Sequence, residues 1–153
     1  MKARVKWVEQ ATFVGESGSG HAVVMDGPPD HGGRELGIRP MEMILLGTGG
    51  CTAFDVVHIM KKFRQPISDC VVEISAERAE SEPKVFTKIH SHFIITGKDL
   101  PEKQVERAVS LSAEKYCSAT QMLGKVAEIT HDYEIVNLEE YFAFHGCMIR
   151  DLF

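Results

Sequence analysis

The chain has 153 residues, of which 44% are hydrophobic and 25% are charged, a composition typical of one soluble domain with a sizeable core. Its 17 Lys and Arg stand against 22 Asp and Glu, which gives a formal net charge of −5. This charge and the lack of a basic stripe argue against a nucleic-acid partner, because neutralising phosphates needs clustered cations.

No segment predicts a secretion signal or a membrane anchor. Residues 1–7 alternate charged and apolar side chains, and no later segment reaches the roughly 18 uninterrupted apolar residues of a membrane span. The cysteines lack the tight spacing of disulfide or zinc motifs; they are Cys51, Cys70, Cys117 and Cys147. We therefore expect a cytoplasmic protein without a membrane partner, whose cysteines are thiols unless they are used for chemistry.

The N-terminal part predicts an antiparallel meander. Residues 2–9 alternate as a half-buried strand, and segments 12–14 and 21–25 continue this pattern on either side of a turn at 15–20. That turn resembles a phosphate loop only in its glycine content, because no Lys-Ser or Lys-Thr pair follows it. Residues 26–37 contain too much Gly and Pro for a regular element and predict an exposed connection.

A long central helix is predicted over residues 40–62. Pro40 suits its first turn, Glu42 suits its positive end, and two lysines suit its negative end. The helix is apolar on nearly every face, yet it carries glycines that each cost roughly 1 kcal/mol relative to Ala. They are Gly47, Gly49 and Gly50. We infer that a second helix or a ligand comes close to this turn.

The remaining segments predict a hairpin, two helices and a closing strand. Asp99 is expected to cap a helix whose apolar stripe extends to Tyr116, and Ser118 is a possible cap for a short helix over 119–126. The strands are expected at 69–79, 85–96 and 129–136. This order predicts an α+β domain over residues 1–137, with 138–153 as a C-terminal extension. A single sheet would leave the apolar helix partly uncovered, which favours an oligomer.

Two cysteines have settings that suit redox chemistry. Cys51 follows the glycines of the central helix, and Cys117 stands at a predicted helix start, where the helix dipole lowers a thiol pKa. Asp55 and His58 share roughly one helix face with Cys51. His58 could polarise the thiol, whereas a charged Asp55 would oppose thiolate formation. The alternative is that both cysteines are structural, because free cysteine is among the most buried residue types.

Other polar patterns predict no metal and no cofactor. His90 and His92 have an H-x-H spacing, and alternate strand residues share a face. Lys88 lies on that face and no third ligand is evident, so a solvated surface is expected.

Two motifs resemble those of the OsmC/Ohr family, and their amino-acid sequences resemble those of its YhfA-like branch. They are PMEMILLGTGGC at residues 40–51 and SAEKYCSAT at residues 112–120, and the resemblance covers about residues 2–136. It implies antiparallel sheets wrapped around a long central helix in an intertwined homodimer. It also implies reduction of organic hydroperoxides, with Cys51 as the peroxidatic thiol, Cys117 as the resolving thiol, and a dithiol as the reductant.

The resemblance also implies an Arg and a Glu that activate the thiolate. The family's glutamate directly follows the helix-opening proline, where this chain has Met41, and Glu42 comes one residue later. Glu42 completes the candidate catalytic set, although its spacing of nine residues from Cys51 places the two on opposite helix faces. Arg34 and Arg39 are the nearest substitutes for the arginine. The alternatives are a non-catalytic protein that binds a small lipophilic ligand, and a redox sensor that acts through the tail.

Overall fold

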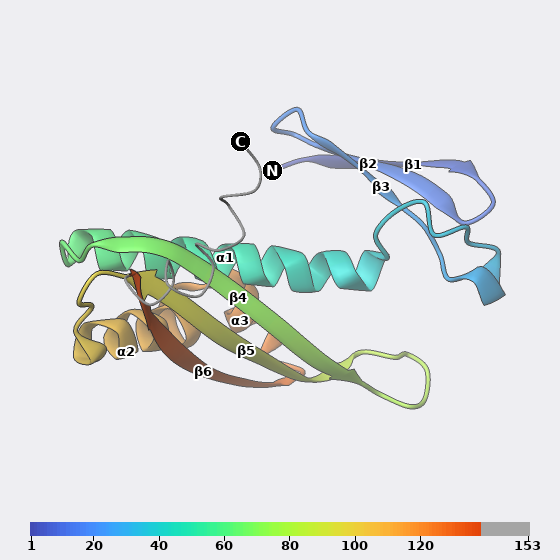
Figure 1. Cartoon of the computed structure of the whole chain (residues 1–153). Helices are drawn as coiled ribbons and strands as arrows, with labels where there is room; N and C mark the ends of the chain where they lie inside the picture. Colours follow the sequence, from blue (N-terminus) through green and yellow to red (C-terminus); the bar gives the residue numbers. More distant parts are fainter. Residues whose placement is uncertain (139–153) are drawn as a thin grey trace, which may run out of the picture. The chain divides into compact units, whose positions relative to one another are not determined.

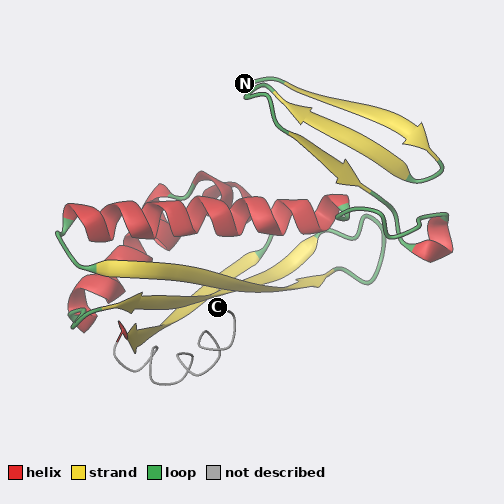
Figure 2. Cartoon of the chain, turned by 45° about the horizontal axis from the view of Figure 1, so that its top comes forward, coloured by secondary structure: helices red, strands yellow, loops and turns green. Residues whose placement is uncertain are grey.

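The computed structural model describes residues 1–138 as two compact units, Met1–Leu46 and a second unit that begins at Gly47. The described residues form two three-stranded sheets, a long helix and shorter helical segments (Figures 1 and 2). The predicted α+β class is therefore confirmed. The predicted boundary after residue 137 stays a prediction, because the proposed extension lies almost wholly outside the described residues.

The first unit contains the predicted antiparallel meander. Its strands are β1 (Ala3–Glu9), β2 (Thr12–Ser17) and β3 (Ala22–Met25), in the order β1-β2-β3. Every residue of β1 is exposed to solvent within the chain. The unit's buried residues are Thr12, Gly15, Met25 and Asp26, so this sheet has almost no hydrophobic core of its own.

The connection after β3 is organised around the buried carboxylate of Asp26. It accepts hydrogen bonds from the backbone N–H groups of Gly27, Arg34 and Leu36 at 2.9, 2.9 and 3.1 Å. The Thr12 hydroxyl donates a fourth at 3.3 Å. A Cβ at Gly33 would lie 1.7 Å from the Gly27 carbonyl oxygen, which explains why this tight fold of the chain needs glycine.

Helix α1 spans Pro40–Lys62, as predicted. Its start is stabilised by Glu42, whose carboxylate accepts a hydrogen bond from the Arg39 backbone N–H at 3.0 Å, and Lys61 and Lys62 lie in its last turn. Among the described residues, α1 is the one helix with the length and composition of a membrane span. An 18-residue stretch of it has a mean hydropathy of 1.5, and 28% of that stretch is buried. Val56 and Met60 nevertheless lie fully buried in the core.

The second sheet has the order β4-β5-β6, with strands β4 (Ile67–Arg78), β5 (Phe86–Gly97) and β6 (Glu128–Asn137). The hairpin of β4 and β5 is antiparallel, as predicted, but β6 pairs with β5 in parallel. The expectation of an antiparallel sheet is therefore wrong for β6. The helical segments between β5 and β6 form a crossover, which is the connection that parallel neighbours require.

The hydrophobic core lies where α1 and α2 (Glu102–Leu111) pack against β5. Its fully buried side chains include Val56, Met60, Phe93, Ile95, Val105 and Val109. Asp99 is not the cap of α2. It adopts a left-handed φ of 48°, and Pro101 occupies the N-cap position without a side-chain hydrogen bond. All members of this core belong to the second unit.

Candidate active site

Cys51 lies half-buried near the middle of α1, after the glycine-rich turn. A Cβ at Gly49 would lie 3.0 Å from the Ile74 Cδ1 atom of β4, so the close neighbour here is a strand side chain and not the predicted helix or ligand. A Cβ at Gly47 or Gly50 would meet no atom of this chain within 4 Å. The approach of a second helix or a ligand therefore stays a prediction.

Cys117 follows an irregular turn. Helix α2 passes into a π-helical turn, Ser112–Tyr116, in which the Cys117 N–H donates to the Ser112 carbonyl at 2.9 Å. Cys117 is extended and forms the N-cap of α3 (Ser118–Leu123). The helical stripe does reach Tyr116, but its last turn is widened, and the short helix begins one residue earlier and ends three residues earlier than predicted. Single π-helical turns occur frequently at functional sites.

Two buried hydroxyl groups join this turn to α1. Ser112 Oγ donates to the Thr52 carbonyl oxygen at 3.0 Å, and the Ser112 and Thr52 hydroxyl oxygens lie 2.7 Å apart. On the other side of the turn, the Thr120 hydroxyl hydrogen-bonds the carbonyl oxygens of Ala113 and Cys117 at 3.1 and 2.9 Å. Because Thr52 is adjacent to Cys51, these contacts fix the two cysteine-bearing segments against each other.

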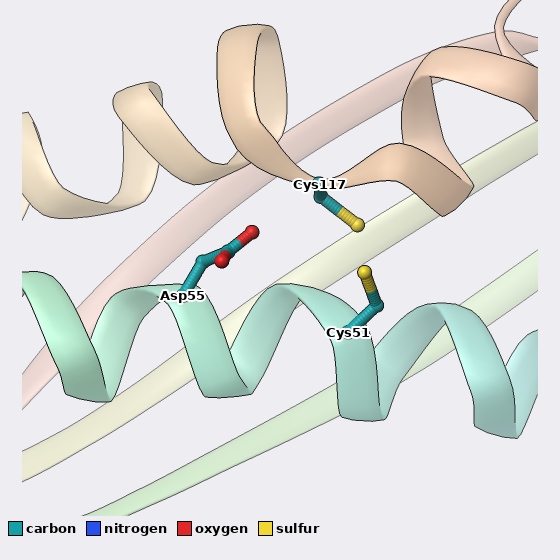
Figure 3. Close-up of side chains that lie close together, drawn as sticks. All are labelled: Cys51, Asp55 and Cys117. Atoms are coloured by element: carbon teal, nitrogen blue, oxygen red, sulfur yellow. The ribbon is translucent and has the colours of Figure 1, made fainter.

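The two sulfur atoms face each other across this junction, with Asp55 beside them (Figure 3). The Sγ atoms of Cys51 and Cys117 and a carboxylate oxygen of Asp55 all lie within 4.8 Å of one another. The predicted thiol pair is thus brought together in space, although its members are 66 positions apart in the sequence. Asp55 was predicted to share a helix face with Cys51, and it does lie beside that thiol.

Burial decides the electrostatics of Cys117. Its side chain is fully buried, which raises its pKa, and a hydrogen bond with Cys51 raises it further, while Thr120 partly opposes both effects. The predicted lowering by a helix dipole is therefore wrong for Cys117, because desolvation outweighs the six-residue helix α3. The Cys117 thiol is therefore protonated at neutral pH.

Asp55 has an unusual environment. Burial raises the pKa of its carboxyl group, and the His58 charge opposes this rise. Its Oδ2 atom is buried without a hydrogen-bond partner, which is uncommon for a carboxylate oxygen. The exposed His58 ring itself stacks on Phe54, with ring centroids 6.0 Å apart, and is not part of the thiol cluster.

The other candidate residues have local roles. Glu42 stabilises the start of α1, Arg34 pairs with Glu9, and Arg39 approaches Glu35 at 3.5 Å. These contacts all lie within the first unit. A catalytic role for Glu42, Arg34 or Arg39 therefore stays a prediction.

The remaining cysteines differ from the pair. Cys70 packs against the core from β4, and burial together with the Asp69 charge raises its pKa to about 11. Cys147 lies outside the described residues.

The H-x-H pair on β5 has a third neighbour that sequence spacing missed. Asp132 of β6 lies 2.5 Å from His92 Nδ1 and 3.4 Å from His90 Nε2. His90 Nδ1 also lies 2.8 Å from the Thr130 hydroxyl. The parallel register pairs His92 with Asp132, and only the pairing of β5 with β6 could reveal this neighbour.

Comparisons with known proteins agree with this architecture. A family model described as OsmC-like protein matches residues 31–132. Protein YhfA of Escherichia coli (strain K12) is 54% identical over 136 residues, which cover 89% of this chain and 98% of YhfA.

Solved structures show the same fold. A hypothetical protein from Aquifex aeolicus VF5 has a TM-score of 0.78 at 29% identity, covering 89% of this chain and 96% of that one. The organic hydroperoxide resistance protein OhrB of Bacillus subtilis has a TM-score of 0.60 at 18% identity, covering 87% and 96%. From the family match and the close relative together, the chain belongs to the OsmC-like family.

Proposed function

We propose that this protein reduces organic hydroperoxides with the thiols of Cys51 and Cys117. The observation that carries this proposal is their asymmetry. Cys51 is partly exposed, so a peroxide can reach it, whereas Cys117 is fully buried beside it and stays protonated. A thiol peroxidase needs this division between an accessible nucleophile and a neighbouring resolving thiol. The hydroperoxide resistance protein OhrB shares the fold, which is consistent with this chemistry.

The proposed cycle has three steps. The Cys51 thiolate attacks the distal oxygen of ROOH, the O–O bond breaks, and a Cys51 sulfenic acid forms while the alkoxide takes a proton from water. The Cys117 sulfur then attacks the sulfenic sulfur and releases water, which leaves a Cys51–Cys117 disulfide. An external dithiol reduces this disulfide by exchange and is itself oxidised. Glu42 is retained in the proposal as a candidate activating residue.

We further propose a cytoplasmic homodimer. Large apolar side chains are exposed within the single chain, including Phe54 and Leu46 of α1 at 70% and 66% and Trp7 of β1 at 62%. The open space beside Gly47 and Gly50 would admit a closely packed second copy. The three cysteines in the described part of the chain are free thiols, as a reducing compartment requires.

The direct test is the consumption of cumene hydroperoxide by reduced protein supplied with a dithiol. Wild type should turn over, and Cys51→Ser should lose more than about 100-fold in rate, because the nucleophile is removed. Without the dithiol, Cys117→Ser should consume one equivalent of peroxide per chain and form no intramolecular disulfide, because the sulfenic acid at Cys51 then has no resolving thiol. Cys70→Ser is the matched control and should keep full activity, since its high pKa leaves it unreactive. Unchanged turnover in Cys51→Ser would contradict the proposal.

A second candidate function is the binding of a small lipophilic ligand. A largely apolar groove of about 370 Å³ lies within the first unit, lined by Val5, Gly15, Val23, Met25 and Met43 among others. Native mass spectrometry of freshly purified protein would detect a stoichiometric ligand, and a Val23→Asp variant should lose it. The third possibility, redox sensing through the C-terminal tail, concerns residues 138–153, of which only residue 138 lies in the described part of the chain.

A further inference from the structure

The carboxylate beside the thiol pair has no role in a two-thiol peroxide cycle. A carboxylate oxygen of Asp55 lies within 4.8 Å of both sulfur atoms. Its buried Oδ2 atom also lacks a hydrogen-bond partner within the described structure. Two thiols and an unpaired carboxylate oxygen that converge on one point form the donor set of a metal site.

We propose that Cys51, Asp55 and Cys117 bind a thiophilic divalent cation, Zn²⁺, through three protein ligands and one water molecule. Zinc holds sulfur at about 2.3 Å and carboxylate oxygen at about 2.0–2.2 Å, so tetrahedral ligand atoms are about 3.6–3.8 Å apart. The three donor atoms already lie within 4.8 Å of one another. Side-chain adjustments of about 1 Å therefore complete the site.

The elements that carry the ligands are suited to holding a cation. Cys51 and Asp55 are one helical turn apart on α1, so their side chains project from the same face. Cys117 is fixed opposite them by the π-helical turn and by the buried Ser112–Thr52 contact. Since Cys51 is partly exposed, its side of the cluster is where a water ligand has access. The cation would also neutralise the orphaned Asp55 oxygen.

This site has a consequence that rests on the proposed function. Thiolates held by Zn²⁺ are not free to attack a peroxide or to form a disulfide, so metal and peroxide would compete for Cys51. Zinc should therefore inhibit peroxide consumption, and a chelator should restore it. Zinc binding itself does not depend on peroxidase activity, so failure of one proposal leaves the other open to its own test.

The test is a Zn²⁺ titration of reduced, untagged, full-length protein without oxygen, against a chromophoric chelator that reports free zinc. Wild type should bind one equivalent per chain. Cys51→Ser and Cys117→Ser should each weaken binding by about 100-fold or more, and Asp55→Asn by at least about 10-fold, because even outer-shell partners contribute that much. Cys70→Ser is the matched thiol control and should bind like wild type.

Two further measurements keep the result decisive if a variant folds poorly. In wild type, Zn²⁺ should protect Cys51 and Cys117, but not Cys70, from alkylation as read by mass spectrometry. Bound Co²⁺ should give the intense thiolate-to-metal absorption of a tetrahedral site. Wild-type affinity in Asp55→Asn, or loss of binding in His92→Ala instead of Cys51→Ser, would overturn the assignment. Absence of both zinc binding and protection would also overturn it.

Discussion

The two units of the chain differ in how much apolar surface they bury. The second unit has a dense apolar core in which Phe93 and Met60 are fully buried. The first unit buries Asp26 and Thr12, with Met25, while Trp7 and Val5 of its sheet are exposed. A sheet with a polar interior and an apolar outer face gains stability when something covers that face. The second unit is accordingly stabilised by its own core, whereas the stability of the first unit depends on what covers its apolar face.

The largest expected effect is on the core of the second unit. Phe93→Ala should lower the free energy of unfolding by about 3–5 kcal/mol, because the side chain is fully buried on the central strand. Urea denaturation followed by circular dichroism would measure this loss. Phe54→Ala, at a 70% exposed position, is the matched control for the isolated chain and should cost far less. Equal losses would show that Phe54 is also buried in the working assembly.

The next largest effect is expected in the first unit, on the association of two chains. Trp7→Ser should leave the fold of a single chain largely intact, since the indole is 62% exposed and its N–H donates to the carbonyl of nearby Gln10. In a homodimer that covers β1, the same change should shift sedimentation toward the monomer. Lys6→Ser, one residue away on the other strand face, should not. Wild type that sediments as a monomer at micromolar concentration would contradict the dimer.

A smaller effect concerns the polar interior of the first unit. Backbone N–H groups, first that of Arg34 and then that of Leu36, lower the pKa of Asp26 below its ordinary 3.8. A lowered native pKa stabilises the fold above pH 3.8, and this stabilisation is lost as the pH falls through the native value. Asp26→Asn removes it at neutral pH, because an amide cannot accept all four hydrogen bonds.

The single tryptophan makes this change measurable in one unit. Trp7 fluorescence reports on the first unit, since the chain contains no other tryptophan. Asp26→Asn should lower the thermal midpoint seen by fluorescence and flatten its acid dependence, with less change in the signal from the second unit. Coincident, unchanged midpoints in wild type and variant would show that the Asp26 contacts add nothing measurable.

The smallest effect belongs to the histidine pair on β5. The hydrogen bond to Asp132 raises the pKa of His92, and the same contact lowers the pKa of Asp132. The pair therefore stabilises the fold most between pH 3.8 and 6.5, weakening as the pH rises through the His92 value or falls through the Asp132 value. Asp132→Asn should lower the His92 pKa measured by NMR, with Glu128→Gln as control. Solvent screening keeps the stability change small.

Local patterns predicted the elements whose signals lie within a few residues of each other. Helix α1 begins and ends as expected because Pro40 and Lys62 mark its termini, and the thiol pair was found through its two motifs. The parallel pairing of β6 and the contact of Asp132 with His92 were missed, because neither leaves a mark in neighbouring residues. The unpaired oxygen of Asp55 depends on packing between segments far apart in sequence, which periodicity does not report.

Because of the π-helical turn, the contact between the two thiols depends on the number of residues before Cys117 as well as on their identity. The Cys117 N–H reaches back five residues to Ser112, one more than an α-helix would allow. Removing any one residue between them would restore a regular helical turn. The deletion would also carry the Cys117 side chain about 100° around the axis, away from Cys51. A variant that kept every cysteine but lacked one residue of this turn would therefore no longer hold the two sulfur atoms side by side.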